Sequence, residues 1–256
     1  MIYEGLITVL AAVFGLLTGS FLNVVIYRLP LGKSVVSPRS FCPGCGRTIK
    51  WYENVPVVSY LLLRGRCHGC GSRIPFRYPV VELLGMTHAV IAIRFFGAGL
   101  DAAFAFIFLM ALTAITFIDW DHRIIPDQIS LSFIFVGLAW SAASPRLDVI
   151  DSLTGILAGG GGLWLIGFLY RVLRDTEGMG GGDIKLMAMI GAFLGLKLIL
   201  PVIVIASFFG SIYGVYLIRR GGDGKSSVAF GSFLAPAAAV CLLFGPFLLS
   251  WYFSMF

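Results

Sequence analysis

Charged side chains are scarce in this chain: 12% of its 256 residues are Asp, Glu, Lys or Arg, whereas 58% are hydrophobic. A soluble domain of ordinary composition is about 25% charged. A surface this poor in charge would not stay in water, so the composition excludes a soluble globular protein and makes lipid the solvent. Each long apolar run must then satisfy its backbone hydrogen bonds internally, which favours membrane-spanning helices.

A cleavable leader is also missing. The first apolar run, residues 6–26, follows Glu4 instead of a basic segment, and no small-residue cleavage site comes after it. We therefore interpret this run as a retained anchor. The net charge of +6 could indicate a nucleic-acid partner, but the distribution of the basic residues argues for membrane topology and against nucleic acid.

The apolar runs predict an all-α polytopic membrane protein with about eight transmembrane helices. A span needs roughly 20 apolar residues, and the fourth and sixth runs are short by that measure, so seven spans or a re-entrant segment stay open. The predicted spans cover residues 6–27, 79–96, 102–118, 128–143, 152–170, 184–196, 198–218 and 228–253.

The basic residues predict which ends of these spans face the cytoplasm. Sixteen of the 19 Lys and Arg residues fall on one side of the predicted spans. The exceptions are Arg94, Arg146 and Lys197. Because cytoplasmic loops carry the excess of Lys and Arg, the first side is cytoplasmic and the N-terminus lies outside.

Glycines at a spacing of four residues predict close packing between helices in lipid. The run 159–162 could also indicate a nucleotide-binding loop, but it lies inside a predicted span, and packing is the better interpretation. The four pairs are Gly15/Gly19, Gly155/Gly159, Gly191/Gly195 and Gly210/Gly214.

The one sizeable polar segment, residues 29–78, contains two Cys-x-x-Cys pairs with 21 residues between them. Four thiolates at this spacing suit a tetrahedral Zn²⁺ with no open position for water, so we predict a structural zinc site. Two disulfides, or a redox role for one pair, are the alternatives; a cytoplasmic position argues against disulfides. The predicted ligands are Cys42, Cys45, Cys67 and Cys70.

Three carboxylates stand in or at the edge of predicted spans: Glu82, Asp119 and Asp183. Ionisable groups are costly there, which makes each of them a candidate for function. Asp183 could simply cap the N-terminus of its helix, and Asp127 is expected to do that for the fourth span. Asp119 closes a helix, where the dipole disfavours negative charge.

The opposed helix ends of Asp119 and Asp183 suggest one proton donor and one proton acceptor, as an aspartic peptidase requires. From helix position alone, this pairing is no better supported than two separate structural roles. The string Asp119-Trp-Asp121 is also a D-x-D pattern of metal-dependent glycosyltransferases, but the chain has no nucleotide-sugar domain to accompany it.

Five motifs, in order along nearly the whole chain, resemble those of the bacterial type IV prepilin leader peptidases, membrane enzymes that are also N-methyltransferases. They are GSFLNVVIYRLP at 19–30, the two cysteine pairs with WYENVP at 51–56 between them, RYPVVE at 77–82, DWDHRIIPD at 119–127 and EGMGGGDIKL at 177–186.

The resemblance implies that Asp119 and Asp183 form the catalytic pair of a Gly-x-Gly-Asp aspartic peptidase. Gly180, Gly182 and Lys185 would belong to its active-site loop. The implied substrates are prepilins and pseudopilins, which would be cut after a glycine at the cytoplasmic face of the bacterial inner membrane.

The resemblance also implies S-adenosylmethionine as the donor of a methyl group to the newly exposed amine. No glycine-rich nucleotide fingerprint marks its site, and the family points instead to the zinc domain near Asn23 and Glu82. We expect an N-terminal helix at 1–28, a zinc-binding domain at 29–78 and a transmembrane peptidase domain at 79–256. The oligomeric state stays open.

Three other functions remain alternatives at this point. Interfacial carboxylates and glycine-rich helices would also suit a transporter or channel, although the aspartates stand at helix ends and the two halves show no obvious repeat. A zinc-bearing assembly scaffold without catalysis is the second alternative. The third is a peptidase without methyl transfer, against which the cysteines argue.

Overall fold

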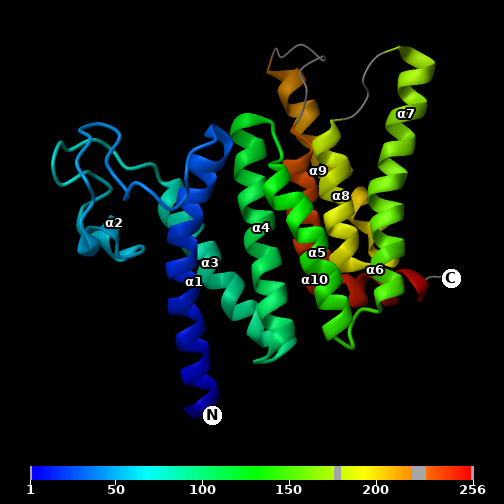
Figure 1. The fold of residues 1–256 in the computed structure, drawn as a ribbon, viewed down its shortest axis with the longest axis horizontal. Helices are drawn as coiled ribbons and strands as arrows, with labels where there is room; N and C mark the ends of the chain where they lie inside the picture. Colours follow the sequence, from blue (N-terminus) through cyan, green and yellow to red (C-terminus); the bar gives the residue numbers. More distant parts are fainter. Residues whose placement is uncertain (1, 176–179, 221–228, 255–256) are drawn as a thin grey trace. The chain divides into compact units, whose positions relative to one another are not determined.

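The computed structural model describes residues 2–175, 180–220 and 229–254 (Figure 1). Its contacts divide the chain into two compact units, Met1–Met110 and Ala111–Phe256. Within the described residues, regular secondary structure is helical apart from two isolated β-bridges. The predicted all-α class is therefore confirmed.

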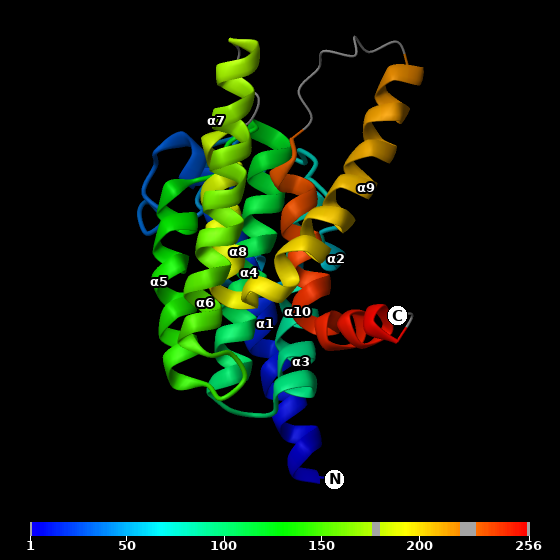
Figure 2. The same ribbon diagram turned by 90° about the vertical axis from the view of Figure 1, so that its right-hand side faces the viewer.

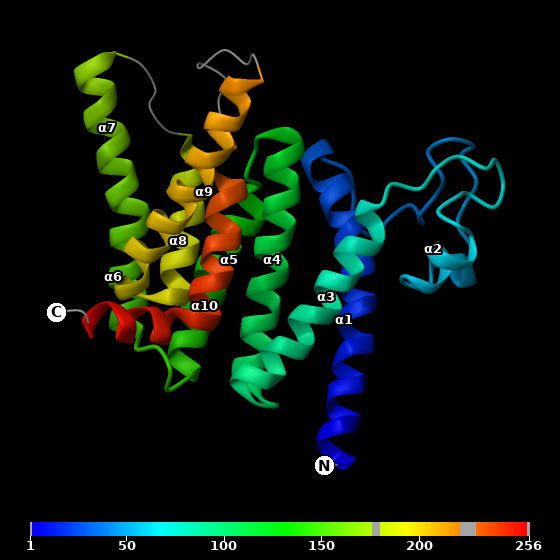
Figure 3. The ribbon, with the colours of Figure 1, turned by 180° about the vertical axis from the view of Figure 1, so that it is seen from behind.

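The first unit is built on two long helices, α1 (Ile2–Arg28) and α3 (Arg77–Phe96), which lie side by side in the views of Figures 1 and 3. Glycine makes this close approach possible. A methyl group added at Gly19 would lie 2.8 Å from the Cα of Glu82, and one at Gly85 would lie 3.0 Å from the Cα of Gly19. The first predicted Gly-x-x-x-Gly pair therefore packs as expected.

The polar segment of the first unit runs between these two helices. It contains only short helical pieces and the two β-bridges, which pair Phe41 with Thr48 and Arg66 with Arg73. Several of its large apolar side chains stay exposed, among them Trp51, Leu62 and Phe76. The pieces are η1 (Leu29–Leu31), η2 (Trp51–Asn54) and α2 (Val58–Leu62).

The second unit is a bundle whose helices are connected by short loops. Helix α4 (Leu100–His122) enters it from the first unit, and a π-helical turn at Leu157–Gly161 joins α6 to α7 without a break, as Figure 2 shows. The other elements are α5 (Asp127–Ala143), α6 (Val149–Ile156), α7 (Gly162–Arg174), α8 (Gly181–Leu194), η4 (Leu196–Leu198), α9 (Ile199–Arg219) and α10 (Gly231–Phe253).

Helix α8 forms the centre of the second unit. It contacts α5, α6, α7, α9 and α10, and every residue from Leu186 to Leu194 is buried. A helix that is apolar on all sides belongs in a protein core or in lipid, and here neighbouring helices enclose most of it. The hydroxyl of Ser152 on α6 adds a buried hydrogen bond, donated at 2.8 Å to the carbonyl of Ala192.

The eight predicted spans all coincide with helices, although the lengths differ. Six helical segments of the described chain are long and apolar enough to cross a membrane. Helix α5 is a shorter apolar helix of 17 residues, and α8 has 14. The exact number of spans therefore stays a prediction.

The remaining glycine pairs separate into two groups. Gly155 on α6 and Gly191 on α8 face each other so closely that each would clash with the backbone of the other if it carried a side chain, and Gly159 meets the Met187 carbonyl in the same way. The prediction for Gly210/Gly214 is wrong: nothing lies within 4 Å of a methyl group added at Gly214. At Gly210, a methyl group would meet only the aromatic side chains of Phe233 and Phe230, at 3.8–3.9 Å, so side chains and not a helix backbone lie against this pair.

Helix α10 changes direction along its length, which is clearest in Figure 2. Two prolines, Pro236 and Pro246, lie inside it. Proline removes a backbone donor and collides with the preceding turn, so bends in helices are commonly found there. The first turn of α10, before both prolines, belongs to the site described next.

Candidate functional site

Asp119 lies in the last turn of α4, with three further helical residues after it, so this helix is longer than the sequence predicts. Its side chain is buried, with 5% of its surface exposed. One carboxylate oxygen, Oδ2, accepts two hydrogen bonds from Ser232: the backbone N–H donates at 2.7 Å and the hydroxyl at 3.0 Å.

Asp183 is the third residue of α8 and is half-buried. The N-cap of this helix is Gly180, so the simple capping role considered for Asp183 is wrong. Its carboxylate interacts electrostatically with Asp119 and accepts a hydrogen bond from the backbone N–H of Gly231. The structure thus brings together the two aspartates that the sequence singled out.

The start of α10 corrects the expectation based on helix dipoles. Asp119 belongs to the C-terminal turn of α4, but its carboxylate points to the N-terminal amides of α10, where the dipole and the free N–H groups favour negative charge. The two aspartates therefore share one helix start instead of facing two opposite helix ends.

The glycines of the predicted active-site loop are not equally constrained. A methyl group at Gly182 would lie 3.1 Å from the Cβ of Ile125, and one at Gly180 would lie 3.5 Å from Oδ2 of Asp183. The first distance leaves little space, and the second is ordinary contact. Residues 177–179 of the same motif lie outside the described residues.

Lys185 pairs with Asp127 and not with the catalytic candidates. Its Nζ donates to both carboxylate oxygens of Asp127 at 2.8 Å. Asp127 is the first residue of α5, after the N-cap Pro126, and makes no capping hydrogen bond. The predicted capping role of Asp127 is therefore wrong, because its carboxylate joins α5 to α8 through Lys185.

Sequence reasoning missed Gly231 and Ser232. They lie in α10, and Ser232 is 113 residues from Asp119 along the chain. Neither residue is ionisable, and a Gly-Ser pair before an apolar run predicts only a helix start. Their position beside both carboxylates arises from packing between helices, which no local pattern records.

The four predicted zinc ligands also meet, within the first unit. The sulfurs of Cys42, Cys45, Cys67 and Cys70 all lie within 4.8 Å of one another, and these cysteines form no disulfide. A Zn–S bond of about 2.3 Å in a tetrahedron places the sulfurs about 3.8 Å apart, and the Cys42 and Cys70 sulfurs are 3.9 Å apart. The donor set and its spacing therefore fit Zn²⁺.

Two matching turns hold these sulfurs. The amide of Gly46 donates to the Cys42 carbonyl at 2.8 Å, and the amide of Gly71 donates to the Cys67 carbonyl at 2.9 Å. Both glycines have left-handed backbone angles, with φ of 70° and 71°, which favour glycine. The glycine after each cysteine pair thus makes the turn possible.

Ser72 prepares two of the four sulfurs for a metal. Its hydroxyl lies 3.5 Å from Sγ of Cys42 and 3.1 Å from Sγ of Cys70. The hydrogen bond with Ser72 lowers the pKa of Cys42 to about 6 and also lowers the pKa of Cys70. Since the thiolate is the form that binds a metal, the hydroxyl of Ser72 favours metal binding by these two sulfurs.

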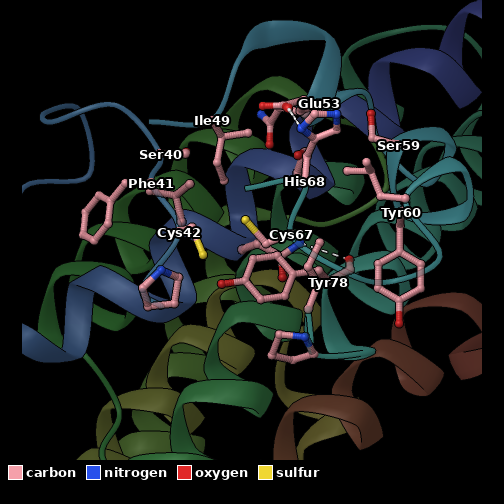
Figure 4. A pocket seen from close by; sticks show the side chains of 18 of the residues that line it. Ser40, Phe41, Cys42, Ile49, Glu53, Ser59, Tyr60, Cys67, His68 and Tyr78 are labelled. Carbon is pink, nitrogen blue, oxygen red and sulfur yellow. Dashed lines mark hydrogen bonds and ion pairs between the residues drawn. The ribbon is translucent and has the colours of Figure 1, made fainter. Parts of the chain in front are cut away.

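A pocket of about 370 Å³ lies between the cysteine turns and the membrane helices of the first unit. Figure 4 shows the rings of Phe41, Tyr60 and Tyr78 in its lining, together with the sulfurs of Cys42 and Cys67. Its volume falls in the usual range for small-molecule sites, which are largely apolar with a few polar groups.

Asn23 and Glu82, the candidates for cofactor binding, both line this pocket. Glu82 is buried on α3, and its Oε2 accepts a hydrogen bond from the amide of Val57 at 2.7 Å. Asn23 on α1 donates to the carbonyl of Tyr78 at 3.1 Å. Two helices and the polar segment thus contribute side chains to one cavity.

Two family models match most of the chain. Residues 13–96 match the model of the bacterial peptidase A24 N-terminal domain, and residues 106–215 match that of the type IV leader peptidase family. Three curated relatives, all described as prepilin leader peptidase/N-methyltransferase, align over almost their entire lengths. They come from Aeromonas salmonicida strain A449 (35% identical, covering 96% of this chain and 93% of the relative), Pseudomonas putida (37%, 92% and 90%) and Burkholderia pseudomallei strain 1026b (38%, 93% and 86%).

The chain belongs to the type IV leader peptidase family. The first family model contains the cysteine site and the pocket, and the second contains Asp119 and Asp183. Membership and the apolar helices together indicate an integral protein of the inner membrane. No solved structure matches the chain at a significant level.

Proposed function

We propose that this leader peptidase cleaves the basic leader from prepilins and pseudopilins after a glycine, and then methylates the new N-terminus with S-adenosylmethionine. The observation that carries the peptidase assignment is the meeting of Asp119 and Asp183 at one helix start, because two carboxylates that interact are the requirement of aspartic-peptidase chemistry. The methyl step rests on the name of the relatives and on the pocket of the first unit.

The chemistry of cleavage follows from the pair. One aspartate, ionised, takes a proton from water as the hydroxyl oxygen adds to the carbonyl carbon of the scissile bond. The other, protonated, gives its proton to the departing nitrogen as the carbon–nitrogen bond breaks. The products are a leader with a free carboxylate and a pilin with a free amine, and no other reactant is needed.

The proposed membrane orientation places both sites on the cytoplasmic side, with the N-terminus outside. It rests on the 16 of 19 basic residues that share one side of the spans. A prepilin anchored in the lipid by its apolar helix would present its scissile bond at that same interface. Gly180 and Gly182 would let an extended peptide approach the backbone beside Asp183.

The peptidase assignment is tested by Asp119→Asn and Asp183→Asn in the full-length protein in detergent or vesicles. Each change should lower cleavage of a prepilin by about 1000-fold or more, since members of a catalytic unit fail together. The mass of the pilin N-terminus gives the readout. The control is Asp148→Asn, because this aspartate is exposed and its side chain caps no helix; an active Asp119 or Asp183 variant would refute the assignment.

We further propose that S-adenosylmethionine binds in the pocket of the first unit, near Asn23 and Glu82. The donor carries positive charge on its sulfonium and ammonium groups, and Glu82 supplies a carboxylate to the cavity. Tyrosine and phenylalanine rings suit a planar adenine. The zinc site would act structurally, by holding the two cysteine turns that form part of the lining.

Glu82→Gln tests this location because it removes the charge and keeps the shape. We expect the affinity for radiolabelled S-adenosylmethionine to fall about 10- to 100-fold by equilibrium dialysis, the range for a lost hydrogen bond or ion pair to a charged group. Glu4→Gln, at an exposed residue of α1, is the matched control. Unchanged affinity after deletion of residues 34–76 would rule the location out.

A further inference from the structure

The first turn of α10 lies between the two aspartates. Gly231 and Ser232 are its first two residues, and their amides are among the four at a helix start that have no acceptor within the helix. The Gly231 amide donates to Asp183, and the Ser232 amide donates to Asp119. Consecutive amides of one rigid turn thus hold the two carboxylates.

We propose that Gly231 and Ser232 are positioning residues of the peptidase, which fix the separation and the orientation of the two carboxylates. This inference rests on the proposed function, because it assigns a role in the reaction of Asp119 and Asp183. Neither residue is asked to exchange a proton with the substrate. Their contribution is to hold the acid and the base in place before the peptide arrives.

The contacts of Ser232 select one oxygen of Asp119. Its amide and its hydroxyl both donate to Oδ2, and the hydroxyl lies closer to this oxygen, at 3.0 Å, than to the carbonyl of Thr116, at 3.3 Å. Ser232 is itself buried, with 5% of its surface exposed. Two donors on Oδ2 fix the rotation of the carboxylate and assign Oδ1 to the attacking water.

Gly231 is required for a different reason. A methyl group at this position would lie 2.9 Å from Oδ2 of Asp119 and 2.7 Å from Cδ1 of Ile125. The first distance would push the carboxylate away from Ser232, and the second would displace the side chain that also contacts Gly182. Glycine therefore fits this position without moving either side chain.

The test compares Ser232→Ala, Ser232→Thr and Gly231→Ala with two controls in the full-length protein. The controls are Ser250→Ala, an exposed serine of the same helix, and Gly214→Ala, a helical glycine with open space around it. Steady-state cleavage of a prepilin peptide gives kcat and KM, and thermal denaturation in detergent reports folding. Asp119→Asn is measured beside them.

We expect Ser232→Ala to lower kcat about 10- to 100-fold with KM within about twofold, since a hydrogen bond to a charged group is lost. Ser232→Thr, which keeps the hydroxyl, should recover most of the rate. Gly231→Ala should lose at least 100-fold in kcat, whereas both controls should retain normal kcat.

The outcomes separate this inference from the function on which it rests. Wild-type kcat in Ser232→Ala, beside an inactive Asp119→Asn variant, would overturn the positioning role and leave the peptidase assignment standing. An active Asp119→Asn variant would overturn the assignment itself. If Ser232→Thr loses as much kcat as Ser232→Ala, or if the loss of rate only follows the loss of thermal stability, the hydroxyl has no special role and the inference is wrong.

Discussion

The two units of this leader peptidase assemble their sites in different ways. In the first unit, a polar segment with short helical pieces holds four cysteines, and a metal ion that fits them would fix its shape. In the second unit, the carboxylates and their donors come from three helices, and the packing of apolar helices around α8 fixes their positions. The cysteine site would depend on a metal that links its four ligands, whereas the aspartate site depends on helix packing. Different changes should therefore damage each site.

The strongest test of this contrast is removal of the metal. We expect Cys67→Ser combined with Cys70→Ser to lower the zinc content, measured by atomic emission spectroscopy, from one ion per chain to near zero. Structural zinc sites are worth roughly 10–16 kcal/mol in small domains, so S-adenosylmethionine binding should be lost as well. Cys241→Ala, at a buried cysteine outside the site, is the control; full zinc content in the double variant would contradict the predicted ligand set.

Overpacking should damage the second unit. Gly155→Ala places a methyl group against the backbone of Gly191, and such strain costs about 1–3 kcal/mol. For a unit of this size that corresponds to a fall of about 2–12 °C in the midpoint of thermal denaturation. Gly214→Ala, which meets nothing within 4 Å, should leave the midpoint unchanged or slightly raise it; equal midpoints for the two variants would show that α6 and α8 are not in close contact.

A smaller and pH-dependent effect is expected at Glu53 in the first unit. The amide of Lys50 and the guanidinium of Arg47 hold the pKa of Glu53 below its usual value. Its contribution to stability is therefore present above the unfolded-state pKa, near 4.3 for Glu, and is lost as pH falls through the folded-state value. Glu53→Gln should speed amide hydrogen exchange in residues 40–55 at pH 7, and its difference from wild type should begin to shrink only as the pH falls below about 4; a difference that grows on acidification would reverse this sign.

The smallest effect is expected at Lys185. Its ion pair with Asp127 joins two helices of the second unit, but 39% and 54% of the two side chains are exposed. Exposed pairs contribute about 0.2–1 kcal/mol, so Lys185→Met should lower the denaturation midpoint by no more than about 4 °C and should keep peptide cleavage. Loss of cleavage would indicate that Lys185 acts in the active site, as the resemblance to the family implies.

The contrast between the units also explains what could be predicted from the sequence. The four cysteines could be predicted because a metal requires fixed ligands at short spacings. Asp183 could be predicted because its Gly-x-Gly-Asp motif is local in the sequence. Ser232 was missed because its role depends on how α10 packs beside α4. Tertiary contacts also place the Asp119 carboxylate beside the start of α10 and pair Asp127 with Lys185.

The glycine patterns show the limit of local signals in another way. Gly15/Gly19 and Gly210/Gly214 have the same spacing in equally apolar runs. The first pair lies against the backbone of α3, whereas in the second pair Gly210 meets only aromatic side chains and Gly214 meets nothing within 4 Å. Spacing predicts that a helix can be approached closely, whereas the identity of the partner depends on the arrangement of the whole bundle.

The shortness of α8 has a consequence for water supply. Its 14 residues span about 21 Å, whereas the hydrocarbon core of a bilayer is about 30 Å thick. If its far end reaches the opposite interface, Asp183 lies below the plane of the lipid head groups. The enzyme then has to thin the bilayer locally or admit water between its helices, and either change brings water, the second reactant of hydrolysis, to Asp183.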